Sequence, residues 1–545
     1  MNKEISTILQ LIQTNNIDKA YELAANLYQK NNTNLDLIKL LGYIYLQKNA
    51  FTTASEFFKR GLYLKPDLED FDYFNNLGAA LLRIEEYEEA IFYLDKAEKI
   101  SQNTPNVYTN FAEVYLALRN FTKADEFIKI AISKIDTGNQ KKITEYISVF
   151  WMMSTINSAL NKDDESVKFF IKLLNIEFNE NIFYLLSTIK PESIPEEIIN
   201  VAIDKSKFNN EKFQNRLKRF YFVTPLFFGL AYYYQKLNKT NSEKYFHKGN
   251  EEIFKTTRYN SYGYQKKIIH SMNYFNNNLK DFNIEDSSIG KDNIFIIGSP
   301  RSGTTLLESI VASNTDVFAG GEIATGKNLM GHHLQTNNLD VKNFYLDFSS
   351  KYVKRTNYIK GEEKKIVDKM PENFLYLGYL LKFLPGCKII RIFRNPWDTA
   401  ISLYKQRYVQ NIPYSSSFFN IAVFLANFEA INLFWDEFLK EKQLKKSVIN
   451  VFYEDLVSRK EENQEMIYKF LDLGSSYDET KRDNFFSITA SMRQVKGGVH
   501  KNSIGKDEFI DKKEEFYDSL QMQRKFWKNY GLDLNDQEFL GYKLD

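Results

Sequence analysis

The stretch "IFIIGSPRSGTTLLESI", residues 294–310, carries the clearest structural signal in the chain. Its four apolar residues 294–297 predict a buried β-strand, and residues 304–313 predict a helix. Between them, residues 298–305 follow the pattern G-x-x-x-x-G-T-T, in which Thr304 stands where a triphosphate-binding loop carries lysine. Backbone N–H groups in such a loop favour an anion. Without that lysine, and with Arg301 inside the loop, a ligand with one phosphate and a further anionic group fits better than a triphosphate.

Three further apolar segments predict strands that alternate with helices. They are residues 365–367, 388–392 and 448–452, and they follow a polar linker near residue 285. This alternation is typical of a parallel, doubly wound sheet, which binds ligands at the carboxyl ends of its strands. The candidate binding motifs all lie at such ends.

The segment "IIRIFRNPWDTAISLYKQ" indicates a second anion subsite. Arg391 and Arg394 end a predicted strand, and Ser402 follows Arg394 by eight residues, about two helical turns into the next segment. A guanidinium group binds phosphate with two parallel hydrogen bonds, and the serine hydroxyl adds a donor. The alternative is a structural arginine paired with a nearby acid such as Asp398. Two subsites together favour a nucleotide phosphorylated at two separate positions.

The N-terminal half contains an internal repeat. Ala20, Ala54, Ala90 and Ala124 fall in one column, separated by 34, 36 and 34 residues. A second column of small residues, Gly42, Gly78 and Ala112, precedes it and predicts close contact between antiparallel helices. The pattern resembles tetratricopeptide repeats, which stack into solenoids that bind other chains. An irregular helical bundle is the alternative.

The repeat pattern sets the predicted domain limits. We expect tetratricopeptide repeats in residues 1–140 and a further helical region with diverged repeats and a linker in residues 141–284. Within that region, residues 141–226 are out of register, whereas residues 227–254 return to a helix-turn-helix pattern. The α/β domain is expected in residues 285–545.

Five motifs in the C-terminal half resemble, in order, those of the sulfotransferase superfamily. They are "GSPRSGTTLLESIVASNTDVFAGGE", "DKMPENFLYLG", "RNPWDTAISLY", "FYEDLV" and "ASMRQVKGGVHKNSIGK". The chain is most similar to the bacterial branch with N-terminal tetratricopeptide repeats, which is related to tyrosylprotein sulfotransferases. The resemblance implies a multidomain fold, with an all-α solenoid followed by an α/β P-loop-like sulfotransferase domain that has a parallel sheet.

The resemblance also implies a donor, 3′-phosphoadenosine 5′-phosphosulfate (PAPS), with 3′,5′-adenosine bisphosphate (PAP) as product and no metal. The expected contacts with the 5′-phosphosulfate are Arg301, Ser302, Gly303, Thr304 and Thr305. Arg394 and Ser402 are expected to bind the 3′-phosphate, and Tyr453 to contact the nucleotide. Lys506 is expected to approach the phosphate side of the nucleotide. The sequence after Gly505, "KDEFIDKKEEF", departs from the family and leaves the role of Lys506 open.

Four residues are implied in catalysis by the same resemblance. Glu322 matches the family's general base, and Lys369 matches a lysine that stabilises the leaving oxygen. Arg301 would share this electrostatic work, and Ser491 would lie near the transferring group. The alternatives are a helix cap or surface acid for Glu322 and an ordinary exposed lysine for Lys369.

Composition excludes several other classes of function. The chain has 545 residues, with 72 Lys and Arg against 70 Asp and Glu, so charge gives no argument for a nucleic-acid partner. A single cysteine, Cys387, excludes a disulfide framework.

The adjacent His332 and His333 lack an acidic or cysteine cluster, which favours solvent exposure over metal binding. The N-terminus shows no secretion signal and no long apolar run, so we expect a cytoplasmic protein without a membrane span.

The favoured hypothesis is a PAPS-dependent sulfotransferase whose solenoid recruits a macromolecular acceptor, protein or saccharide, or a protein partner. Two alternatives stay open. One is a repeat scaffold with a nucleotide-binding but non-catalytic domain, and the other is a kinase, disfavoured by the missing lysine. The acceptor can be a protein tyrosine, a saccharide or a small metabolite.

Overall fold

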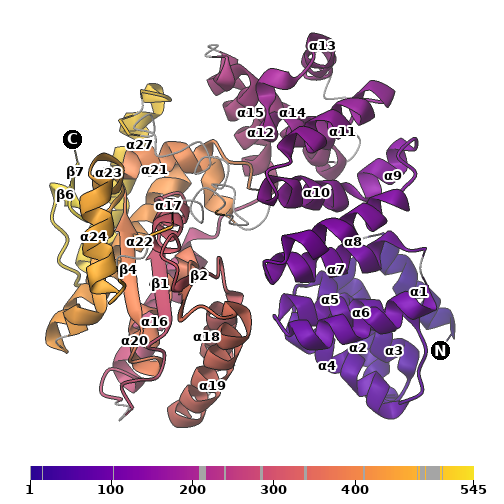
Figure 1. Cartoon of the computed structure of the whole chain (residues 1–545), viewed down its shortest axis with the longest axis horizontal. Helices are drawn as coiled ribbons and strands as arrows, with labels where there is room; N and C mark the ends of the chain where they lie inside the picture. The colour runs from indigo at the N-terminus through magenta and orange to yellow at the C-terminus, as the bar shows by residue number, and fades with distance from the viewer. Residues whose placement is uncertain are drawn as a thin grey trace. The chain divides into compact units, whose positions relative to one another are not determined.

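The computed structural model describes most of the chain in two compact units, residues 1–166 and 167–545. Figure 1 shows the helices and strands of both units. The predicted domain limits at residues 140 and 284 stay predictions. Ser491 and Lys506 lie outside the described residues, which are 2–14, 16–101, 103–207, 216–237, 241–282, 286–336, 340–408, 412–442, 444–474, 477–478, 485, 504–505 and 507–544.

The first unit consists of successive helices joined by short turns. The helices are α1 (Asn2–Gln13), α2 (Ile17–Lys30), α3 (Leu35–Gln47), α4 (Phe51–Leu64), α5 (Phe71–Arg83), α6 (Tyr87–Ile100), α7 (Pro105–Ala117), α8 (Phe121–Ser133), α9 (Gln140–Glu145) and α10 (Ile147–Ala159). Helix α11 (Asp163–Ile176) crosses the limit between the units.

The predicted repeat is confirmed by burial and by the turns within each helix pair. All four alanines of the first column are fully buried. A Cβ atom added to Gly42 would lie 2.7 Å from the Phe58 ring, so only a hydrogen fits there. The turns share a left-handed residue at Asn49, Glu85, Arg119 and Asn161. The last of these extends the repeating turn beyond residue 140, where the sequence columns end.

The second unit begins with helices that the sequence placed before the sheet. They are α12 (Glu180–Ile189), η1 (Pro191–Ser193), α13 (Glu196–Lys205), α14 (Arg216–Lys236), α15 (Asn241–Thr256) and α16 (Ser261–Asn278). The helix-turn-helix predicted for residues 227–254 is the pair α14 and α15. Its helices meet where Gly249 faces Phe228, since a Cβ atom at Gly249 would lie 2.7 Å from that ring.

A five-stranded parallel sheet follows, in the order β2-β3-β1-β4-β5. The predicted strands are confirmed as β1 (Asn293–Gly298), β3 (Lys365–Asp368), β4 (Lys388–Phe393) and β5 (Val448–Phe452). The edge strand β2 (Val317–Ala319) was not predicted, because three residues are too short for a periodic signal. From β1 the chain first builds one side of the sheet and then the other, so the switch point lies at β1.

Helices separate and follow the strands of the sheet. They are α17 (Thr304–Val311), α18 (Ala324–Thr336), α19 (Val341–Lys360), η3 (Pro371–Tyr376), α20 (Leu377–Phe383), α21 (Pro396–Tyr404), η4 (Pro413–Ser416), α22 (Phe418–Glu441), η5 (Leu444–Ser447), α23 (Tyr453–Ser458), α24 (Lys460–Phe470), η7 (Ile510–Lys512) and α27 (Lys513–Asn529). A short hairpin, β6 (Glu538–Phe539) and β7 (Tyr542–Lys543), ends the chain. Helix α17 ends two residues before the predicted limit.

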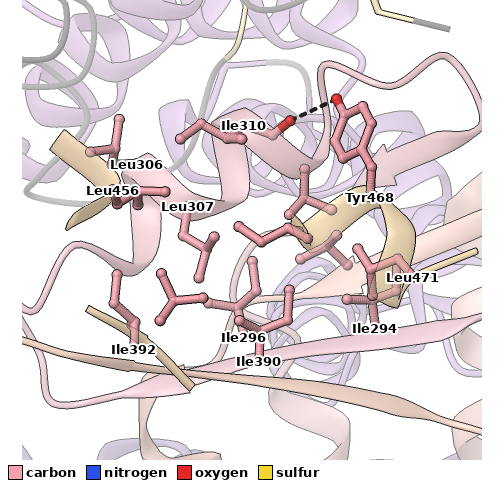
Figure 2. Packing of buried hydrophobic residues seen from close by; sticks show 14 of the residues in the cluster. Ile294, Ile296, Leu306, Leu307, Ile310, Ile390, Ile392, Leu456, Tyr468 and Leu471 are labelled. Carbon is pink, nitrogen blue, oxygen red and sulfur yellow. Dashed lines mark hydrogen bonds between the residues drawn. The ribbon is translucent and has the colours of Figure 1, made fainter. Parts of the chain in front are cut away.

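Alternate residues of β1 face opposite sides of the sheet, as the pleat requires. On one side Ile294 and Ile296 pack with Leu307 and Ile310 of α17 and with residues of α23 and α24, as Figure 2 shows. The Tyr468 hydroxyl donates a hydrogen bond of 3.0 Å to the Ile310 carbonyl and ties α24 to α17 (Figure 2). This core fixes α17, and with it the loop that precedes the helix.

The opposite face is covered by α19, α20 and α22. Phe295 of β1 contacts the Tyr352 ring at a centroid distance of 5.6 Å, and Phe393 of β4 contacts Phe428 at 6.1 Å. By length and hydropathy α22 could cross a membrane, but 89% of its most apolar window is buried inside the protein. Such burial is that of a core helix.

We predict that Leu307→Ala destabilises the second unit by about 2–5 kcal/mol, because it removes a fully buried side chain beneath α17. Leu346→Ala is the control: this side chain is 52% exposed, and its loss should cost less than about 0.5 kcal/mol. Urea unfolding followed by the fluorescence of Trp397, Trp435 and Trp527 measures both. Equal destabilisation by the two variants would contradict the packing in Figure 2.

Candidate functional site

The carboxyl ends of all five parallel strands meet at one edge of the sheet, and a predicted site residue follows each of them. The loop 299–305 follows β1, and Glu322 follows β2. Lys369, Arg394 and Tyr453 stand directly after β3, β4 and β5. The structure therefore brings together all the predicted site residues that it describes.

The loop after β1 is held in a strained conformation. Arg301 has a φ of +71° and Gly303 a φ of +100°, both in the left-handed region. The Ser302 amide and hydroxyl donate to the Ser299 carbonyl at 3.1 and 2.7 Å and close the turn. For a non-glycine residue this conformation costs on the order of 1 kcal/mol or more, and such strain gathers at functional sites. It directs the Arg301 side chain toward α21.

Arg301, Ser402 and Arg394 form one connected group. The Arg301 Nε donates to the Ser402 Oγ at 3.0 Å, and the Arg394 Nη1 donates to the Arg301 carbonyl at 2.9 Å. The Arg394 guanidinium lies 4.4 Å from the centre of the Tyr453 ring. Burial lowers the pKa of Arg394, while Tyr453, Asp398 and Glu454 raise it and the positive charge of Arg301 lowers it. The two guanidinium groups are thus buried near each other, an arrangement that an anion would stabilise.

The alternative reading of this region, a strand-end arginine paired with a nearby acid, describes Arg391. Arg391 makes the structural contacts, donating to the Asp436 carboxylate at 2.5 Å and to the Asn450 side chain at 2.9 Å. Asp398 accepts a hydrogen bond of 2.9 Å from the Gly505 amide, and its charge also acts on Arg394. Asp398 therefore holds the segment at Gly505 next to the site.

Lys369 and Glu322 form an ion pair of 2.8 Å between Nζ and Oε1. The Lys369 side chain is 1% exposed, so it is not an ordinary surface lysine, whereas 42% of the Glu322 side chain is exposed. The Lys369 amide also donates to the Gly321 carbonyl at 2.7 Å. A buried ammonium group thus faces a carboxylate that solvent or a ligand can reach.

Sequence reasoning missed residues that position this pair. The Gly321 amide donates to the Glu308 carboxylate at 2.9 Å, and Glu308 is fully buried on α17. Asp368, next to Lys369, accepts a hydrogen bond of 2.7 Å from the Tyr352 hydroxyl. The sequence signal for Glu308 was a single acidic residue inside an apolar segment, because a buried carboxylate needs a hydrogen-bond partner.

The expectation of solvent exposure is wrong for His333. It is buried, its Nε2 lies 2.6 Å from the Tyr274 hydroxyl, and its ring stacks on Phe344 at 3.6 Å. The His332 side chain lies outside the described residues. Among the residues that the structure describes, no group of three or more His, Cys, Asp or Glu side chains is placed to hold a metal ion.

The edge of the sheet suits an anionic ligand. Arg301, Arg394 and Lys369 are all buried there. At the start of α17 the first backbone N–H groups have no acceptor within the helix. Buried cations beside a helix N-terminus are the donor set that phosphate and sulfonate groups require.

Comparison with known families gives matches for both halves of the chain. Residues 293–478 match the Sulfotransferase family, which spans β1 to β5. Residues 40–68 match the Tetratricopeptide repeat, and residues 74–203 match the Tetratricopeptide repeat protein 21 fourth ARM domain.

Individual relatives match only parts of the chain. An uncharacterized protein of Aquifex aeolicus (strain VF5) is 30% identical over 235 residues, 39% of this chain and 30% of that protein. The solved structure of MamA 41-end from Desulfovibrio magneticus RS-1 is 15% identical and covers 32% of this chain and 94% of its own, with a TM-score of 0.27. YrrB, described as a TPR protein with an unusual peptide-binding site, is 16% identical and covers 33% and 87%, with a TM-score of 0.26.

We predict that Gly303→Ala destabilises the protein by at least about 1–2 kcal/mol, since alanine tolerates this left-handed conformation poorly. Its Cβ atom would also lie 2.4 Å from the Tyr453 ring. Gly331→Ala, within α18, is the matched control: its Cβ atom meets nothing within 4 Å, so the change should stabilise the helix by up to about 1 kcal/mol. Urea unfolding distinguishes them, and a neutral Gly303→Ala would contradict the loop conformation.

Proposed function

Because the chain is a tetratricopeptide-repeat protein with a sulfotransferase-family domain, we propose that it transfers a sulfonate group from PAPS to an acceptor hydroxyl. The observation that carries the proposal is the cluster at the sheet edge. Three buried cations, Arg301, Arg394 and Lys369, meet there beside the accessible carboxylate of Glu322. Cations for an anionic donor and a base for the acceptor proton are what the reaction needs.

The residues present fit PAPS. Two neighbouring guanidinium groups suit a nucleotide with two separate anionic groups, and the hydrogen bond between Arg301 and Ser402 joins the two subsites. In this proposal Arg301 and residues 302–305 hold the 5′-phosphosulfate, while Arg394 and Ser402 hold the 3′-phosphate. Tyr453, stacked on Arg394, contacts the nucleotide.

PAPS supplies the sulfonate group, and PAP leaves. Glu322 takes the proton of the acceptor hydroxyl through its exposed carboxylate. Lys369 donates a hydrogen bond to the oxygen on which negative charge develops as the sulfur–oxygen bond breaks. Because the two side chains are hydrogen-bonded, each holds the other in place until substrates bind. Contributions from Ser491 and Lys506 stay predictions, since both lie outside the described residues.

The solenoid has a separate role in this proposal. Tetratricopeptide repeats bind other chains along a concave surface, and here they would recruit a macromolecular acceptor, protein or saccharide, or a protein partner. A cytoplasmic location, which the sequence favours, belongs to the same proposal. The proposal does not choose among a protein tyrosine, a saccharide and a small metabolite as acceptor.

We predict that PAP binds and that Arg394→Ala weakens its binding by roughly tenfold to a hundredfold, the effect of losing a charged hydrogen bond of about 1.5–3 kcal/mol. Isothermal titration calorimetry measures the affinity. Arg459→Ala, which removes an arginine whose side chain is 56% exposed, should bind PAP as the unaltered protein does. ATP with magnesium should bind weakly. If folded protein does not bind PAP, the repeat scaffold without transferase activity becomes the better explanation.

We predict that Glu322→Gln lowers kcat by roughly 10²–10⁴-fold, the usual contribution of a general base, while PAP affinity stays unchanged. The rate of PAP release from PAPS, measured with an acceptor found among phenols, saccharides and peptides, gives the number. Glu465→Gln, an exposed residue of α24, is the control. Full activity of Glu322→Gln would assign the base to another residue.

A further inference from the structure

Arg407 lies just after α21 in an unusual setting. Its Nε and Nη2 atoms both donate to the Thr224 hydroxyl oxygen, at 3.3 and 3.2 Å. Its guanidinium group lies 5.1 Å from the centre of the Tyr184 ring. Thr224 belongs to α14 and Tyr184 to α12, so helices outside the residues that match the sulfotransferase family hold this arginine.

Among the described residues, none balances the positive charge of Arg407. In the part of the chain that the structure describes, no carboxylate forms an ion pair with Arg407. The Thr224 oxygen is uncharged, and its hydroxyl already donates to the Phe220 carbonyl at 2.9 Å. One oxygen atom therefore receives two of the five donors of a guanidinium group. Burial lowers the pKa of Arg407, whose side chain is half-buried, and a partly desolvated cation without a counterion is unfavourable.

Arg407 is also close to the proposed reaction centre. Ser402, on the preceding helix, contacts Arg301 at 3.0 Å. The Tyr232 hydroxyl donates to the Lys405 carbonyl at 2.9 Å, and its ring lies 6.2 Å from that of Tyr184. A chain of direct contacts thus leads from Arg301 to Arg407 through α21 and α14.

The neighbouring residue Tyr408 points to the same location. Burial raises the pKa of Tyr408, while the charge of Arg301 lowers it and that of Glu322 raises it. The Tyr408 hydroxyl is therefore within electrostatic reach of both the donor loop and the proposed base.

We propose that Arg407, supported by Tyr184 and Thr224, binds an anionic group of the acceptor, a carboxylate, sulfate or phosphate carried near the hydroxyl that is sulfonated. The inference rests on the proposed function, since it names the acceptor class for that site. An oxyanion with two oxygens on the Nε–Nη2 edge replaces the single Thr224 oxygen and balances the charge. The helices before the sheet thereby become part of acceptor recognition.

Inorganic sulfate tests the proposal without knowledge of the acceptor. Sulfate is titrated by calorimetry into protein saturated with PAP, with sodium chloride used to hold the ionic strength constant. We expect a saturable sulfate site whose affinity falls at least tenfold in Arg407→Gln and partly recovers in Arg407→Lys. Arg459→Gln, an exposed arginine of the same unit, should leave it unchanged. Absence of the site, or the same affinity in Arg407→Gln, overturns the proposal.

Thermal stability separates a binding role from a structural one. Arg407→Gln should melt at the same temperature as the unaltered protein or higher, because a partly buried charge without a described counterion is removed, and it should lose the sulfate-induced rise in Tm. A lower Tm with an unchanged sulfate effect would show a structural role and overturn the proposal.

PAP affinity is measured in the same variants. Loss of PAP binding in all of them contradicts the proposed function, whereas loss of sulfate binding only in Arg407→Gln supports the acceptor site.

Discussion

The parallel pairing of five strands is the constraint on which the rest of the site depends. β1 pairs with β4 from Ile294 opposite Lys388 to Gly298 opposite Ile392, so both strands end at the same level. Residues far apart in the sequence, such as Arg301 and Arg394, therefore meet as neighbours. Apolar cores on both faces hold the sheet in this register. The chemistry at the edge is a consequence of that packing.

The buried charges and the strained backbone of the site lower the stability of the fold, and neighbouring groups offset part of this loss. Lys369 is buried but paired with Glu322, and Arg394 is buried but stacked on Tyr453 and bonded to the Arg301 carbonyl. Arg301 itself has a left-handed backbone. Buried charge and strain of this kind persist only where the surrounding structure is rigid, as it is between β1 and α17. Such costs are typical of functional sites.

The sequence predicted what depends on local pattern and missed what depends on distant contacts. Apolar runs predicted four strands, but β2 has only three residues and carries no such run. Small-residue columns predicted the repeats up to residue 140, and beyond it the left-handed turn at Asn161 and the helix pair α14 and α15 continue the pattern. His333 was misread because its buried contacts include Tyr274, on a helix 59 residues earlier. The ion pair of Lys369 with Glu322 likewise joins positions 47 residues apart.

Two helices before the sheet, α14 and α15, also support the site. The last turn of a helix leaves backbone carbonyls without partners. At the end of α21, the Asn250 side chain donates to the Tyr404 carbonyl at 2.7 Å, and the Tyr232 hydroxyl donates to the Lys405 carbonyl at 2.9 Å. α14 and α15 thus complete the helix that carries Ser402. Because Ser402 in turn holds Arg301, the geometry of the loop 299–305 depends on helices that lie outside the residues matching the sulfotransferase family.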